Sequence, residues 1–203
     1  MNRKVYRFFY GLMDVQERFL NRFAKEGWRL VRTSRFLYEF EPCQPGQCCY
    51  CVDFVAQMGA GKANEYQQFL EDMGYRVMPR PMNVNWSLGK VRLRPWASKW
   101  GKVASVPGAF NKEVFVVEKV NDGTPFQLHT TLEDRTNYYR LLRNVWLYLT
   151  LLFAGAALLF VVKKDFPWRV VVSAILALLH GLVALHSHVL LIQMQTDSRV
   201  TES

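Results

Sequence analysis

The sequence lacks the short motifs around which many enzymes are built. It contains no Gly-x-Ser-x-Gly elbow, no His-Glu-x-x-His pair, no phosphate-binding loop and no Gly-x-Gly-x-x-Gly turn. Histidine is also scarce. Only His129 of the four histidines precedes the apolar C-terminal segments. Two threonines follow it in the sequence, and no neighbouring carboxylate could assist it as a general base. These absences predict a protein that is not an enzyme and that uses no cofactor.

Cysteine is sparse too, and all of it falls in one short segment: Cys43, Cys48, Cys49 and Cys51. Such crowding suits a reducing compartment better than a disulfide framework. A structural zinc site needs ligand pairs of the Cys-x-x-Cys kind, which this spacing does not supply. We therefore predict no metal site and interpret the cysteines as small apolar strand residues, with metal binding or redox sensing as the alternative.

The N-terminus offers no segment typical of a secretory signal, because charge interrupts the short apolar run from Val5 to Phe9. Together with the cysteines, this predicts that the N-terminal domain stays in the cytoplasm. Residues 1–144 hold 22 Lys or Arg against 14 Asp or Glu, so this part of the chain is basic. Its length suits one domain.

Acidic residues are absent from Met73 to Lys112, where cations and aromatic side chains alternate. Two hypotheses are open: contact with anionic membrane lipid, and simple solvated strands. Nucleic-acid binding is disfavoured, because no recognition motif accompanies the charge. The candidate residues for an anionic surface are Arg76, Arg80, Lys90, Arg92, Arg94, Lys99, Lys102, Trp86, Trp96 and Trp100.

The periodicities of the first 130 residues predict an α+β domain. Asp14 to Glu26 has the spacing of an amphipathic helix that stops at Gly27, with Asp14 as its N-cap. A shift of 47 residues superposes this helix, its stop and the following strands on a second set, which suggests a duplicated βαββ unit, repeats 4–42 and 48–94. Asn121-Asp122-Gly123-Thr124 predicts a β-hairpin over 113–130.

Two long apolar segments, 145–162 and 170–192, predict a transmembrane hairpin. A juxtamembrane helix, 131–144, precedes them and a polar tail, 193–203, follows. Residues at helical spacing in the second span favour packing against the first span, where Ala154, Gly155 and Ala157 could supply the opposing surface. That face comprises Ser173, Ala177, His180, Ala184 and Ser187, with His180 expected to form a hydrogen bond across the interface.

Several short motifs resemble one bacterial family of uncharacterised domains. The resemblance implies a soluble module ahead of membrane spans, often encoded beside PadR-type transcriptional regulators, and it implies no catalytic residue. Cys51 departs from the pattern, which has an aromatic or basic residue there. The motifs are Phe19-Leu20 through Leu30, Tyr38-Glu39-Phe40, Cys49 through Phe54, Gly74-Tyr75 and Leu128 to Thr131 ahead of Tyr138-Tyr139.

These observations predict a non-enzymatic, membrane-anchored regulatory or sensory protein, with its N-terminal domain and C-terminus in the cytoplasm. Its expected partners are membrane lipid and either a second copy or another protein, bound through the transmembrane helices. Two alternatives stay open. One is a small-molecule binding module for a bulky apolar or cationic ligand held between the repeats, which is an analogy from fold alone. The other is an accessory or immunity-type subunit of a membrane complex.

Overall fold

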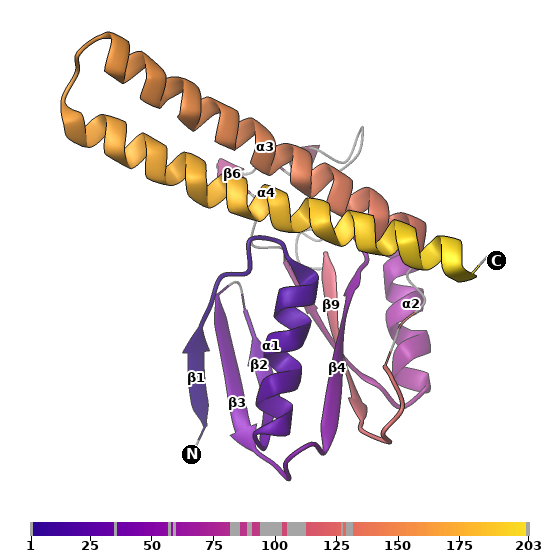
Figure 1. Ribbon diagram of the computed structural model, residues 1–203. Coiled ribbons are helices and arrows are strands. Elements are labelled where there is room, and N and C mark those ends of the chain that lie inside the picture. Colours follow the sequence, from indigo (N-terminus) through magenta and orange to yellow (C-terminus); the bar gives the residue numbers. More distant parts are fainter. Residues whose placement is uncertain are drawn as a thin grey trace. The chain divides into compact units, whose positions relative to one another are not determined.

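A computed structural model describes residues 2–34, 36–56, 58, 60–81, 86–88, 91–93, 103–104, 113–126, 128 and 132–201. The chain divides into two compact units, Met1–Thr130 and Thr131–Ser203. The first is the α+β region and the second is a pair of long helices, as the sequence predicts (Figure 1).

The first half of the α+β unit is a three-stranded antiparallel sheet covered by one helix. Its elements are β1 (Arg3–Tyr6), α1 (Met13–Lys25), β2 (Trp28–Thr33) and β3 (Leu37–Pro42), with strand order β1-β3-β2. The apolar face of α1 packs on β3: Phe23 stacks on Phe40 with ring centroids 4.5 Å apart, and Phe19 meets Tyr38 edge-on at 5.6 Å. This aromatic layer is the core of the first half.

The ends of α1 show one correct and one wrong prediction. Gly27 follows the helix with a φ of +85°, a conformation that glycine adopts without strain, so the predicted stop is confirmed. Asp14 is not the N-cap. The cap position is Leu12, and Asp14 lies inside the first turn, where its carboxylate accepts a 2.7 Å hydrogen bond from Arg18.

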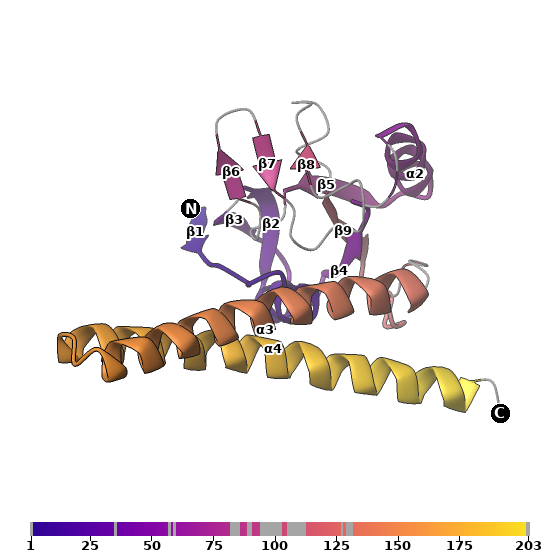
Figure 2. The same cartoon turned by 90° about the horizontal axis from the view of Figure 1, so that it is seen from above.

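The second half repeats the strand order of the first with different spacing along the chain. It contains β4 (Cys48–Phe54), α2 (Ala60–Asp72), β5 (Arg76–Arg80) and β9 (Val114–Val120), ordered β4-β9-β5. The short strands β6 (Trp86–Leu88), β7 (Val91–Leu93) and β8 (Val103–Ala104) form a third sheet (Figure 2). The predicted repeat 48–94 therefore has the wrong final strand, and the duplication is not confirmed.

β9 is the central strand of the second sheet, since it pairs with β4 along one edge and with β5 along the other, and both of its faces are covered. Its residues alternate: Phe115 and Val117 join the core beneath α2, while Val114 and Glu118 face the first half of the unit. The predicted hairpin partner of β9 is absent among the described positions of 125–128, which form no strand. Pro79 is tolerated because β5 lies at the edge of its sheet.

The helix α1 also closes the outer edge of β4. The Asn21 amide donates to the Tyr50 carbonyl and accepts from the Tyr50 N–H, both at 2.8 Å. One turn earlier, Glu17 accepts the Val52 N–H at 3.0 Å. These side chains supply backbone partners that an edge strand would otherwise take from water or from another chain.

The second unit is a helical hairpin of α3 (Leu132–Val162) and α4 (Pro167–Thr201). The residues predicted as a polar tail continue α4 as helix to Thr201. The stretches Arg135–Val162 and Pro167–Met194 are long and apolar enough to span a membrane. Large apolar side chains remain exposed along both, including Leu151, Leu158, Leu178 and Leu182.

The packing face predicted on α4 contains three of the four buried positions among the described side chains of the helix, the fourth being Leu191. Ser173, Ala184 and Ser187 are buried, and His180 lies between the rings of Trp146 and Phe153, with centroids 5.3 and 5.2 Å away. Two details of the prediction are wrong. The Nδ1 atom of His180 contacts the Leu176 carbonyl of its own helix at 2.5 Å, and Ala154 and Gly155 are exposed instead of facing α4.

A candidate ligand niche in the α+β unit

Two polar clusters lie inside the α+β unit, and only one is closed. The closed cluster centres on Glu118, which is 5% exposed. Its carboxylate accepts from Arg29 at 2.7 Å and from the Tyr50 hydroxyl at 2.9 Å, and Arg76 lies 3.8 Å away. The Tyr50 oxygen in turn accepts the Leu30 N–H at 2.7 Å. Because no buried side-chain nitrogen or oxygen of these residues is without a hydrogen-bond partner, we interpret the cluster as structural.

The electrostatics of this cluster agree with a structural role. Burial first, and then the hydrogen bond with Cys48 and the charge of Glu118, raise the pKa of the Tyr50 phenol far above its ordinary value. The hydrogen bond to Glu118 raises the pKa of Arg29. A neutral phenol and a charged guanidinium therefore hold Glu118, and the cluster links both sheets of the unit.

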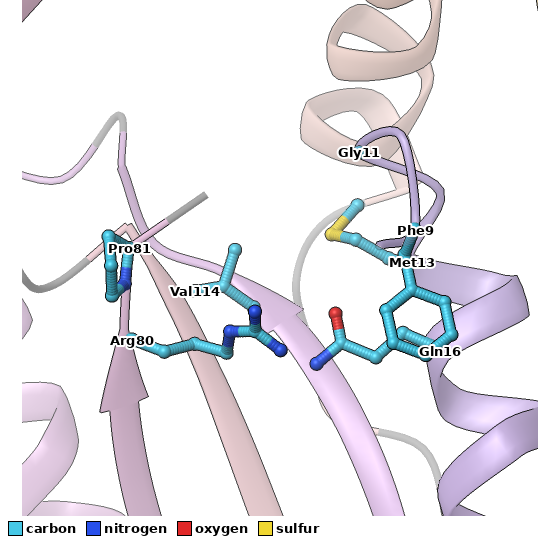
Figure 3. A pocket seen from close by; sticks show the side chains of 7 residues that line it. All are labelled: Phe9, Gly11, Met13, Gln16, Arg80, Pro81 and Val114. Atoms are coloured by element: carbon cyan, nitrogen blue, oxygen red, sulfur yellow. The ribbon is translucent and has the colours of Figure 1, made fainter. Parts of the chain in front are cut away.

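The second cluster is a niche between the two halves of the unit (Figure 3). It is a cavity of about 10 Å³, which is about the room that one water needs. The β1–α1 loop, the first turn of α1, the end of β5 and the start of β9 each contribute to its walls. The lining residues are Phe9, Gly11, Met13, Gln16, Arg80, Pro81 and Val114.

Arg80 supplies the charge of the niche from a position that is only 2% exposed. Its guanidinium lies 5.0 Å from the centre of the Tyr38 ring, and one N–H donates to the Tyr38 hydroxyl. Burial lowers the pKa of Arg80 to about 10, so the group stays a cation at neutral pH. The fold therefore keeps a positive charge at a buried position.

Gln16 completes the niche from the opposite side. Its side chain is buried, at 6% exposure, and its Nε2 atom has no hydrogen-bond partner. Figure 3 shows the Gln16 amide nitrogen and the Arg80 guanidinium pointing toward one another. Two groups that only donate hydrogen bonds through these atoms face the same small space, which is an environment for an acceptor oxygen.

The predicted anionic surface is only partly within the described residues. Arg80 is wrong as a surface residue, because it is buried. Arg76 donates to the Leu30 and Val31 carbonyls at 3.0 and 2.9 Å, so it joins β5 to β2. The structure does not describe the side chains of the other candidates. It does place the backbone of Trp86 in β6 and the backbone of Arg92 in β7. The remaining members are Lys90, Arg94, Lys99, Lys102, Trp96 and Trp100.

The four cysteines are free thiols along the entry to β4. Burial raises the pKa of Cys43, Cys48 and Cys49. Cys48 donates to the Tyr50 hydroxyl at 3.5 Å, and Cys49 lies 3.8 Å from the Lys119 carbonyl. In the part of the chain that the structure describes, no three metal-ligating side chains are grouped.

A family model for a protein of unknown function, DUF2812, matches residues 13–151. The chain belongs to the DUF2812 family. The match runs from the start of α1 into α3 and includes Gln16, Arg80 and Val114 of the niche. No curated protein and no solved structure matches the chain.

The DUF2812 region contains two residues of this site that sequence reasoning missed: Gln16, which lines the niche, and Tyr38, which contacts Arg80. Gln16 lies among the buried positions Met13, Phe19 and Phe23 of α1, so it is a polar residue on the apolar face of an amphipathic helix. This polar residue on an apolar face was the feature of the sequence that could have indicated a buried polar site. Tyr38 carried no comparable signal, because an aromatic residue inside a strand is ordinary.

Proposed function

We propose that the protein is a non-enzymatic, membrane-anchored sensor whose α+β unit binds a small ligand through an anionic oxygen. The observation that carries this proposal is the buried guanidinium of Arg80 facing the unpartnered amide of Gln16 across the niche. A buried polar group without a partner costs about 1–3 kcal/mol. A ligand oxygen that accepts from both groups recovers that free energy and adds a charge-assisted hydrogen bond.

The chemistry of the niche narrows the ligand class. A cation would meet the Arg80 charge at close range, and a bulky group exceeds a cavity of about 10 Å³. A carboxylate oxygen fits both the donors and the volume. Because Phe9, Met13 and Val114 line this small volume, a group attached to that carboxylate must itself be small and apolar.

Replacing Gln16 by leucine tests this assignment. We expect Gln16→Leu to raise the free energy of unfolding of the unliganded protein by about 1 kcal/mol, because it removes a buried donor without a partner. The measurement is the urea midpoint of the full chain in detergent. The matched control is Gln68→Leu on the exposed side of α2, which should change little. A lower stability of Gln16→Leu would mean that the Gln16 side chain already bonds within the protein.

The same pair of variants tests binding. The probes are acetate and propionate at matched ionic strength, with ethylammonium as the cationic counterpart. We expect at least one carboxylate to raise the thermal midpoint of the wild type and of Gln68→Leu but not that of Gln16→Leu. A shift that Gln16→Leu retains, or a shift caused only by ethylammonium, would contradict the proposal.

Membrane anchoring through α3 and α4 is the second part of the proposal. Both helices have the length of a span, and their exposed leucine side chains would be costly in water. If both helices cross the bilayer, the α+β unit and the end of α4 lie on the same side, and the turn at Lys163 to Asp165 lies on the other. The four free thiols favour the cytoplasm for the first side.

Thiol labelling in spheroplasts tests this orientation. Cys43 and Cys49 are partly exposed, so a membrane-impermeant maleimide should label them only after permeabilisation. In a cysteine-free background, Lys164→Cys in the turn should react before permeabilisation. Labelling of Cys43 in intact spheroplasts would place the α+β unit outside the cell.

A further inference from the structure

The helical hairpin has a groove of its own, which the proposed ligand niche does not include. Its volume is about 250 Å³, below the range of about 300–1,000 Å³ that encloses a drug-sized molecule. Leu147 of α3 and Leu185 of α4 are apolar wall residues, and Gly181 and Ala184 keep the groove open because their side chains are small. Arg143 and His188 lie at one end.

The polar end of the groove carries a positive charge with neutral partners. Arg143 donates to the Asn144 side-chain oxygen at 2.9 Å, and its guanidinium lies 3.5 Å from the His188 ring. Among the hairpin side chains that the structure describes, the one carboxylate is Asp165, which pairs with Arg169 at 2.8 Å near the turn. Among these described side chains, Arg143 therefore has partners without a formal negative charge, Asn144 and His188.

The position of Arg143 along α3 matches the depth of a lipid headgroup. Nineteen residues separate it from Val162 at the end of the helix, which is ~28 Å at 1.5 Å per residue. The hydrocarbon core is ~30 Å thick, so a hairpin with its turn at one interface places Arg143 near the other. The small residues of the groove then lie within the hydrocarbon.

We propose that this groove binds an anionic phospholipid, with its phosphate on Arg143 and one acyl chain against Gly181 and Ala184. The inference rests on the membrane-spanning part of the proposed function. A second copy of the chain fits the groove less well, because symmetric pairing at equal depth would bring two Arg143 guanidinium groups together. A phosphate supplies a negative partner that the described side chains around Arg143 do not, and an acyl chain covers the apolar walls.

Native mass spectrometry of the full chain tests the proposal. The protein is reconstituted with equal amounts of phosphatidylglycerol and phosphatidylcholine, extracted in detergent and compared for bound lipid. We expect the wild type to retain phosphatidylglycerol, and Arg143→Gln to lower its retention relative to phosphatidylcholine about fivefold, the effect of one cation near an anionic surface. Gly181→Leu, which fills the groove, should lower retention of both lipids.

Arg140→Gln is the matched control, because Arg140 is exposed one turn before Arg143 and does not line the groove. If Arg140→Gln and Arg143→Gln lost equal amounts of bound phosphatidylglycerol, the effect would come from surface charge in general, and the proposal would be overturned. A lipid-free dimer that Gly181→Leu disrupts would assign the groove to a second copy instead. Extraction of membranes with alkaline carbonate distinguishes failure of the anchor from failure of the lipid site. Release of the wild-type protein from the membrane would refute the membrane anchor. A protein that stays in the membrane but shows no lipid preference would refute only the lipid site.

Discussion

Replacing Phe40 by alanine should lower the free energy of unfolding of the α+β unit by about 4 kcal/mol. Phe40 is fully buried at the centre of β3, stacked on Phe23 and 6.1 Å from the Phe19 ring. Truncation removes the buried ring and leaves a cavity between α1 and the sheet, for which about 3–5 kcal/mol is typical. Urea unfolding of the full chain in detergent, followed by near-UV circular dichroism, measures the loss.

Phe69→Ala is the control for this prediction. Phe69 is mostly exposed on α2, and alanine favours the helix, so its replacement should change the midpoint by less than about 1 kcal/mol. Similar losses in the two variants would mean that the aromatic layer beneath α1 is not the stabilising core of the first half.

Replacing Glu118 by alanine should cost about 3 kcal/mol, although it removes no apolar contact. The carboxylate is the shared acceptor of Arg29 and the Tyr50 hydroxyl. In the alanine variant this buried hydroxyl loses its acceptor, and the charges of Arg29 and Arg76 lose the carboxylate that lies between them. Removing one member of a buried charged pair typically costs about 3–5 kcal/mol. We expect the lower end because both arginine side chains are 39% exposed and can turn toward water.

Two further variants show whether the effect belongs to the buried charge. Glu41 lies 3.9 Å from the same Arg29 but is exposed, so Glu41→Gln should change stability by less than about 0.5 kcal/mol. Glu118→Gln keeps an acceptor oxygen and should cost less than Glu118→Ala. If Glu41→Gln and Glu118→Ala were equally destabilising, the link between the sheets would not depend on burial of Glu118.

Elements were predictable from the sequence wherever the signal is local. The helix at 14–26 and the strand at 113–120 follow from apolar spacing and from stops such as Gly27, and the structure has them within a residue or two. The place of β9 between β4 and β5 was not predictable in this way. The predicted repeat 48–94 placed the final strand of the second unit before residue 94, but β9 supplies a longer apolar run that can be covered on both faces.

The polar sites were less predictable because their members are distant in sequence. Arg29 and Glu118 are 89 residues apart, and no periodicity connects them. For Arg80, charge alone indicated an exposed surface, whereas the fold buries the side chain against Tyr38. Spacing did identify the buried face of α4, but it could not show that Trp146 and Phe153, instead of small residues, lie opposite His180.

The hydrogen bonds from α1 to β4 have a further consequence if the proposed anchor holds the protein on a membrane. Copies confined to one surface collide often, and an open sheet edge can recruit a strand from a neighbouring copy. On β4, Glu17 and Asn21 already occupy the backbone groups of Tyr50 and Val52. The opposite outer strand, β1, carries Arg3 and Lys4, whose charges oppose edge-to-edge pairing. These contacts and charges at β4 and β1 therefore oppose the pairing of these two outer strands with a neighbouring copy.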